Sequence, residues 1–183
     1  MQNRTPRIPR QPVSNRAEPD AGLTAELTAV VAGARRRALR DGDRHIDTAH
    51  LLHSLIESDP GARAVFDGGA QLAKVLGYLV QRSIGYGLRW QGSVEDSGAV
   101  PVVTDPGAAV RESGAERWSP AAASAMAEAR ARATRRGDGR AGGLDLLAAL
   151  ATDHDCRAVE VLERAGVDAE SLAARVARAS GRD

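Results

Sequence analysis

A pattern of helix signals occurs twice in this chain, 95 residues apart, and it constrains the fold more than any other sequence feature. In the first copy, Leu23-Thr24 is followed by apolar residues at spacings of three and four, up to Gly42-Asp43. In the second copy, Trp118-Ser119 leads through the same spacings to Gly137-Asp138. Apolar residues three and four apart form one face of an α-helix, and a glycine after them is typical of a helix end. The repeat therefore predicts two copies of one helical unit.

Each copy predicts four helices, and the best matched positions are apolar. The expected boundaries in the first copy are N-caps at Thr24 and at Asp47 or Thr48, a stop at Gly42, a short helix opened by Pro60 and stopped by Gly68-Gly69, and a fourth helix through residues 72–79. The matches to the second copy include Leu51, Leu52 and Leu55 with Leu146, Leu147 and Leu150, Arg63-Ala64-Val65 with Arg157-Ala158-Val159, and Val75 and Leu79 with Leu172 and Val176.

The composition agrees with a helical fold. The chain is 43% hydrophobic but only 3% aromatic, so Ala, Leu and Val must form its core. These residues, together with abundant Arg and Glu, favour helices over strands. A unit of four short helices is too small to bury its apolar faces alone. We predict an all-α fold of about eight helices, in which two tandem four-helix repeats pack as a pseudo-twofold bundle around one core.

Two segments interrupt the helical pattern and divide the chain. Residues 1–21 are rich in Arg and Pro and are expected to form a disordered arm. Residues 85–117 are rich in Gly and Pro and are expected to link the repeats. The repeats then occupy residues 22–84 and 118–179, and residues 180–183 form a tail.

Charge and cysteine content exclude several classes of protein. The 25 basic residues balance 24 acidic ones, so no overall field directs the chain to nucleic acid or membrane. Almost all the basic residues are arginine, which indicates a GC-rich bacterial genome. Cys156 is the only cysteine, which excludes an intramolecular disulfide and a cysteine-based zinc cluster. No apolar run is long enough for a membrane span or a signal peptide, so a cytoplasmic protein without membrane partners is expected.

The repeat unit resembles the N-terminal domain of Clp ATPases, of the ClpA and ClpC type. A repeat of that family reads roughly F-T-x-x-A, then G-H-N-Y-I-G-T-E-H-L-L-L-G-L after a helix, then V-A-x-x-V-L-x-x-x-G-V-D. Here the matching segments are Leu23-Thr24 and residues 43–52 in the first copy, and residues 118–120, 144–147 and 157–168 in the second. The resemblance covers about residues 23–179 and implies the family's all-α tandem fold.

The resemblance also implies a function. In this family the domain recruits adaptors and substrates to an AAA+ unfoldase and its peptidase. The sequence contains no G-x-x-x-x-G-K-[ST] phosphate loop and no G-x-S-x-G nucleophile elbow. The expectation is a non-catalytic, cofactor-free module that modulates Clp-dependent proteolysis as an adaptor or a decoy. Its expected partners are a Clp unfoldase, the adaptors or substrates of that unfoldase, or cyclic peptide antibiotics.

In the ClpC branch, a Thr-Glu pair in each repeat helps to form a phosphoarginine pocket, because a carboxylate accepts paired bonds from a guanidinium group. The corresponding residues here are Thr48 and Ala49 in the first copy, and Gly143 and Leu144 in the second. Both glutamates are missing, and so is the second threonine. The pockets are therefore degenerate, which argues against phosphoarginine binding.

A groove between the two first helices is the other site that the resemblance implies, since small cyclic peptides dock there. Trp118 takes the place of the family's phenylalanine at the start of the second repeat. The expected groove residues are Thr24, Val31, Arg35, Trp118, Ser119 and Met126. For Val31 and Met126, core packing is an equally good interpretation.

Three alternatives start from other residues. His50, His53 and Glu57 share one helical face and have the side chains of a zinc site, although His50 also matches a structural histidine of the family. Cys156 and His154 are two residues apart, a spacing that does not place them face to face for nucleophilic catalysis. The alternative function is a nucleic-acid-associated regulator, which would use two arginine clusters, Arg35, Arg36, Arg37, Arg40 and Arg44 and Arg130, Arg132, Arg135, Arg136 and Arg140.

Overall fold

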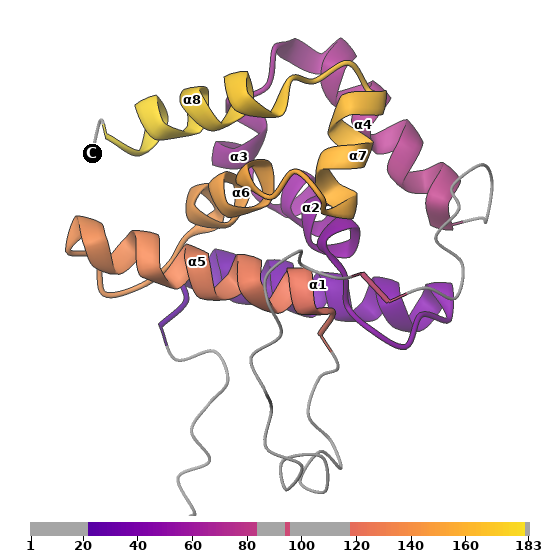
Figure 1. Ribbon diagram of the computed structural model, residues 1–183, viewed down its shortest axis with the longest axis horizontal. Coiled ribbons are helices and arrows are strands. Elements are labelled where there is room, and N and C mark those ends of the chain that lie inside the picture. Colours follow the sequence, from indigo (N-terminus) through magenta and orange to yellow (C-terminus); the bar gives the residue numbers. More distant parts are fainter. Residues whose placement is uncertain (1–21, 84–93, 96–117, 182–183) are drawn as a thin grey trace, which may run out of the picture.

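A computed structural model describes residues 22–83, 94–95 and 118–181, and these residues form eight helices and no strand (Figure 1). The first half contributes α1 (Ala25–Asp41), α2 (Thr48–Ser58), α3 (Pro60–Ala64) and α4 (Gly68–Ser83), and the second α5 (Pro120–Arg136), α6 (Gly143–Thr152), α7 (Arg157–Arg164) and α8 (Ala169–Ser180). The all-α tandem fold is therefore confirmed. The predicted arm and nearly all of the predicted linker lie outside the described residues.

The helix ends follow the predicted caps with one exception. Thr24 accepts a hydrogen bond from Leu27 N (3.2 Å), and Ser119 accepts the equivalent bond from Ala122 N (3.1 Å). Gly42 and Gly137 end α1 and α5 in the left-handed conformation, with φ of 75° and 84°, which glycine adopts without strain. The prediction for Gly68-Gly69 is wrong, because α3 already ends at Ala64 and this pair opens α4. Gly68 makes the turn between the two helices with φ of 82°.

Two short backbone pairings join the repeats reciprocally. Leu23 pairs with Ala141 in a parallel bridge, and Trp118 pairs with Ile46. The start of each repeat therefore lies beside the turn before the second helix of the other. Thr24 N donates to Ala141 O (2.9 Å), and Ser119 N donates to Ile46 O (2.9 Å). Because the two bridges are equivalent under the 95-residue offset, they follow the pseudo-twofold relation of the repeats.

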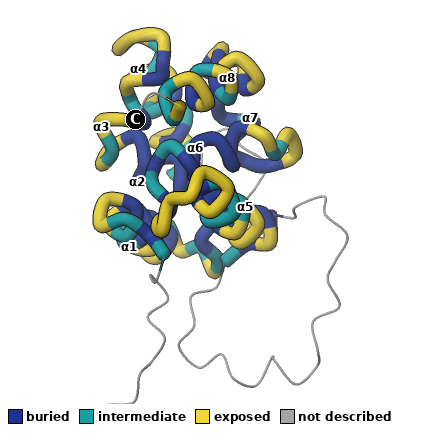
Figure 2. Tube along the Cα trace, turned by 90° about the vertical axis from the view of Figure 1, so that its left-hand side faces the viewer, coloured by how far each residue is buried: buried dark blue, intermediate teal, exposed yellow. Residues whose placement is uncertain are grey.

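A single core lies between the layers of helices. Figures 1 and 2 both show α1 and α5 together in one outer layer, with α2 and α6 at the centre of the molecule. The buried apolar residues of both repeats form one continuous cluster, as predicted. In α2 every residue from Thr48 to Ile56 is buried, and α6 is buried almost as completely. Neither repeat therefore has a core of its own.

The repeats differ most in their third and fourth helices. The matched pairs Val75 and Leu172, and Leu79 and Val176, are buried in α4 and α8 as predicted. However, α8 packs closely along α6, whereas α4 packs on α7 and α2 (Figure 1). The match of Arg63-Ala64-Val65 to Arg157-Ala158-Val159 is wrong, since α3 begins before Arg63 but α7 begins at Arg157.

Candidate functional site

The four residues of the degenerate pockets lie in the first turns of α2 and α6. Thr48 and Ala49 are fully buried, Gly143 is buried, and Leu144 is partly buried. The two positions where the resembling family carries glutamate thus hold apolar side chains in or beside the core. Each first turn meets the third helix of the other repeat, so two pseudo-equivalent junctions exist. They are built from different residues.

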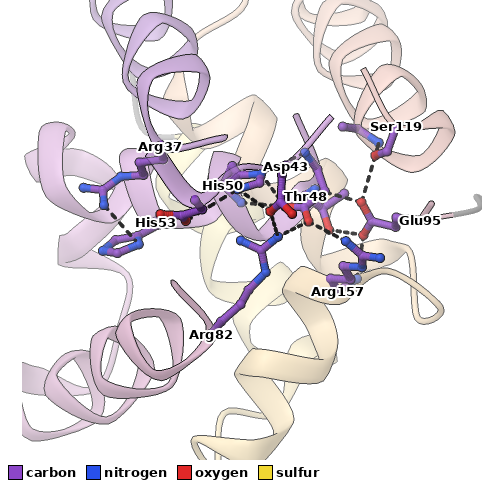
Figure 3. A network of polar contacts seen from close by, with 12 residues as sticks. Arg37, Asp43, Thr48, His50, His53, Arg82, Glu95, Ser119 and Arg157 are labelled. Carbon is purple, nitrogen blue, oxygen red and sulfur yellow. Dashed lines mark hydrogen bonds and ion pairs between the residues drawn. The ribbon is translucent and has the colours of Figure 1, made fainter. Parts of the chain in front are cut away.

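The first junction holds the carboxylate of Glu95 (Figure 3). Glu95 is only 5% exposed, and its Oε2 accepts hydrogen bonds from Thr48 N (2.9 Å) and Ser119 Oγ (2.9 Å). Its Oε1 accepts from Arg157 N (2.7 Å) and from the Thr48 hydroxyl. Thr48 Oγ1 in turn accepts from Ala158 N (3.0 Å). The Glu95 carboxylate and the Thr48 hydroxyl therefore accept the hydrogen bonds of backbone N–H groups at the N-termini of both α2 and α7.

A charged network that includes Asp43, Arg82 and Arg157 lies beside this carboxylate (Figure 3). It is centred on Asp47, the N-cap of α2. Asp47 is 2% exposed, and its Oδ2 accepts from Arg157 Nη1 (2.7 Å) and from Arg82. Arg82 also reaches Asp43 Oδ2 (3.0 Å). Burial on its own raises the pKa of Asp47, but the hydrogen bonds and charge of His50 and the charge of Arg82 outweigh it and hold that pKa well below its usual range. Asp47 is therefore ionised in the folded protein.

His50 completes the network from inside the core. Its Nδ1 accepts from Asp47 N (3.1 Å), and its Nε2 lies 3.2 Å from Asp43 Oδ2. Asp43, Asp47 and His50 are the one group of three potential metal ligands among the described residues. Arg82 already places its guanidinium between both carboxylates, so these residues do not fit a metal ion.

His50, His53 and Glu57, the trio considered as an alternative zinc site, do not face one another. His53 Nδ1 lies 3.3 Å from Arg37 Nη1, and its Nε2 lies 3.2 Å from Glu57 Oε1. His50 instead faces the aspartates of the first junction. Cys156 is buried, which raises the pKa of its thiol to about 11, and its Sγ donates to Leu150 O (3.5 Å). This cysteine is part of the core.

The second junction has no counterpart of Glu95 among the described residues. Asp59, the N-cap of α3, accepts from Ala62 N (3.0 Å) and lies against the first turn of α6. A Cβ on Gly143 would lie 1.8 Å from Asp59 Oδ2, so a threonine there would collide with this carboxylate. The glycine that breaks the family's pattern therefore makes room for Asp59.

A surface pocket of about 370 Å³ opens over the first junction. It is lined by Gly42, Asp43, Arg44, His45, Asp47, Val94, Glu95, Ser119 and Arg157. The pocket combines both signs of charge with backbone of the turn before α2. Of the predicted groove and degenerate-pocket residues, Ser119 is the one that lines this cavity.

The predicted groove residues are divided between core and surface. Val31 and Met126 are each 4% exposed and belong to the core, whereas Arg35 is exposed. Thr24 and Trp118 are partly buried at the reciprocal bridges. Ser119, the sixth member, is the fully buried N-cap of α5. The groove as a binding site stays a prediction.

Sequence reasoning missed three residues of the junctions. Glu95 lies in the predicted linker, and nothing in its neighbourhood in the sequence distinguishes it from a solvated acid. Arg82 reaches Asp47 over 35 positions of sequence. Asp59 carried a local signal, because an Asp before Pro60 is typical of an N-cap.

The fold is that of a tandem four-helix repeat domain. A search with family models finds no match, and a search of curated proteins finds none either. Solved structures do match. The Hsp104 N-terminal domain from Candida albicans is 12% identical with a TM-score of 0.64, over 88% of this chain and 93% of that one.

Two further structures agree. The N-terminal domain of the caseinolytic protease associated chaperone ClpD from Arabidopsis thaliana is 19% identical with a TM-score of 0.61, over 91% of this chain and 99% of that one. A structure from a malarial protein secretion system is 15% identical with a TM-score of 0.59, over 86% and 93%. The chain therefore has the fold of the Clp and Hsp104 N-terminal domains. None of its described helices has the length and apolar character needed to cross a membrane.

Proposed function

We propose that this chain is a non-catalytic module that binds polypeptides and modulates Clp-dependent proteolysis, as an adaptor or as a decoy. The observation that carries the proposal is a fold shared, over about nine-tenths of the chain, with N-terminal domains of Hsp104 and ClpD. A phosphate loop is missing from the sequence, and no nucleophile motif replaces it. Recruitment is the function that such a fold supports best.

The degenerate pockets support a ligand other than phosphoarginine. A guanidinium group needs acceptors, but Ala49 and Leu144 offer none at the two glutamate positions. The first junction presents donors to a carboxylate instead. We therefore expect the proposed module to recognise a chemical group other than phosphoarginine on its partner.

The arginine clusters favour a protein partner over nucleic acid. Several of their members pair with carboxylates of the chain itself, which lowers the positive charge available to phosphates. These pairs are Arg37 with Glu57, Arg40 with Asp41, Arg135 with Glu128, and Arg136 with Asp138 and Asp145.

A degradation assay tests the proposal. The purified chain is added to a Clp unfoldase and peptidase from a related bacterium, and the degradation of a reporter substrate is followed with and without it. An adaptor raises the rate and a decoy lowers it. An unchanged rate, together with no binding to unfoldase, adaptor or substrate, refutes the proposal. Binding to nucleic acid that falls steeply with salt would replace it with the alternative.

A matched pair of variants tests the predicted groove in the same assay. Arg35 and Arg36 are adjacent and both exposed on α1, but only Arg35 belongs to the predicted groove. Arg35→Ala is expected to weaken the effect on degradation, and Arg36→Ala to leave it unchanged. Equal effects of the two variants would remove the groove from the proposal.

A further inference from the structure

The first junction holds the Glu95 carboxylate in the way that a binding site holds a ligand. Four donors converge on it: the Thr48 amide, the Thr48 hydroxyl, the Ser119 hydroxyl and the Arg157 amide. They come from α2, from the segment before α5 and from α7, so three separate parts of the fold build the site. Both hydroxyl-bearing residues are fully buried, which fixes their positions.

The chemistry of these donors selects a carboxylate. An ionised carboxylate only accepts hydrogen bonds, and here it meets only donors. Two of them are first-turn amides of α2 and α7, where the helix dipoles add positive potential. The Arg157 guanidinium binds Asp47. The site thus binds a carboxylate through placed amide and hydroxyl groups.

The carboxylate can be reached from the surface. Glu95 is 5% exposed, but Val94 beside it is 55% exposed, and both line the 370 Å³ pocket. Arg44 and His45 line the same pocket at the surface. A side chain from outside the molecule therefore has a path to the four donors once the Glu95 carboxylate is elsewhere.

We propose that this donor cluster is a carboxylate-binding site that Glu95 fills as an internal ligand, and that a glutamate or aspartate side chain of a bound polypeptide takes its place when Glu95 is displaced. The existence of this site does not depend on the proposed function, whereas its use by a partner rests on that function. Glu95 then competes with the partner, so that binding of an acidic segment is weaker than the site alone allows.

Small carboxylates test the site. Glu95→Ala removes the internal ligand, so acetate is expected to raise the melting temperature of this variant but not that of the wild-type chain. Acetamide, the neutral counterpart, is expected to have no effect. Adding Ser119→Ala to the variant is expected to reduce the acetate effect. The control Glu163→Ala removes an exposed glutamate of α7 and is expected to respond to acetate as the wild type does.

Equal effects of acetate on wild type and Glu95→Ala, or equal effects of acetate and acetamide, would overturn the proposal. If Glu95→Ala does not fold alone, its refolding on addition of acetate is the readout. Glu95→Gln keeps the shape of the side chain and provides a second variant.

A peptide tests the competition. The segment G-S-V-E-D-S-G, residues 92–98, is synthesised with Glu and with Gln at position 95. The Glu peptide is expected to bind Glu95→Ala at least about tenfold more tightly than the Gln peptide does, since hydrogen bonds to a charged group are lost. It is also expected to bind Glu95→Ala more tightly than wild type. Equal binding in either comparison would refute the competition. If the chain changes no degradation rate and binds no Clp component or substrate, the proposed function is refuted but the carboxylate site is not, because the acetate effect needs no partner.

Discussion

The turns that lead into α2 and α6 occupy equivalent places but carry opposite charges. In the first repeat, Asp41 ends α1 and its Oδ2 lies 3.8 Å from His50 Nε2. In the second, Arg136 ends α5 and its Nη2 donates to Asp145 Oδ2 (2.9 Å). Asp41 matches Arg136, and His50 matches Asp145, under the 95-residue offset. The carboxylate of the matched pairs therefore lies at Asp41 in the first repeat but at Asp145 in the second.

A comparison of the two turns shows which side-chain property the fold requires at the start of α2 and α6. Asp47 N donates to His50 Nδ1 (3.1 Å), and Gly142 N donates to Asp145 Oδ2 (2.9 Å). Either side chain satisfies the same backbone donor, so the fold specifies an acceptor and not a residue type. The cap position itself differs more, because Asp47 adds a charge and Gly142 adds no side chain. The charged network of the first junction follows from this one difference.

The largest expected effect comes from making the first turn resemble the second. Asp47→Gly removes the carboxylate that Arg82 and Arg157 share, so that two largely buried guanidinium groups each lose an ion pair. Breaking a buried ion pair from one side costs about 3–5 kcal/mol. We expect a loss of this size in the free energy of unfolding, measured by urea denaturation.

The matched control for this variant is Asp43→Gly. Asp43 also binds Arg82, but its side chain is 38% exposed, so the expected loss is below about 1 kcal/mol. Asp47→Asn keeps the cap but not the charge and is expected to fall between the two. If Asp47→Gly costs no more than Asp43→Gly, the network does not stabilise the first junction.

A second prediction tests why the second junction has glycine where the first has Thr48. A Cβ on Gly143 would lie 1.8 Å from Asp59 Oδ2 and 3.1 Å from Leu55 Cδ1. Gly143→Ala therefore forces the α3 cap to move and is expected to cost about 1–3 kcal/mol in the free energy of unfolding.

Gly142→Ala is the control for this clash, because its Cβ would lie 3.8 Å from Thr24 Cγ2, an ordinary contact. We expect a loss below about 0.5 kcal/mol. Combining Gly143→Ala with Asp59→Ala is expected to cost less than the sum of the two single changes. Strict additivity would mean that Asp59 is not what excludes a side chain at position 143.

The sequence was sufficient for the fold because the fold depends on local signals. Caps at Thr24 and Ser119, the stops at Gly42 and Gly137, and the helical spacing of apolar residues are all properties of neighbouring residues. One local prediction failed at Gly68, since a glycine with positive φ suits both the end of one helix and the entry to the next.

The junctions could not be predicted in the same way, since their contacts join distant parts of the chain. Arg157 meets Asp47 across 110 positions, and Glu95 meets Arg157 N across 62. The resemblance pointed to the turns at Thr48 and Gly143, but it did not predict the carboxylates of Glu95 and Asp59 that lie against them. A carboxylate in a segment of Gly and Pro gives no periodic signal.

The smallest effect concerns a buried imidazole that only the first repeat has. His53 is 5% exposed between Arg37 and Glu57, whereas its match in the second repeat is the buried Ala148. Burial, and then the charge of Arg37, lower the pKa of His53 from 6.5 to about 4, although Glu57 opposes the shift. Between these values the unfolded chain binds a proton that the folded protein does not, so stability falls as the pH falls from 6.5 towards 4.

His53→Ala, which makes this position equal to its match in the second repeat, is expected to remove this component. Urea denaturation at pH 7.5 and at pH 5 then shows a difference in unfolding free energy that is smaller than in wild type by about 1–2 kcal/mol. His154→Ala replaces an exposed histidine and serves as the control, with an unchanged difference expected. If His53→Ala and wild type lose equal stability on acidification, His53 takes up its proton as readily in the folded chain as in the unfolded one, and the acid sensitivity belongs to other groups.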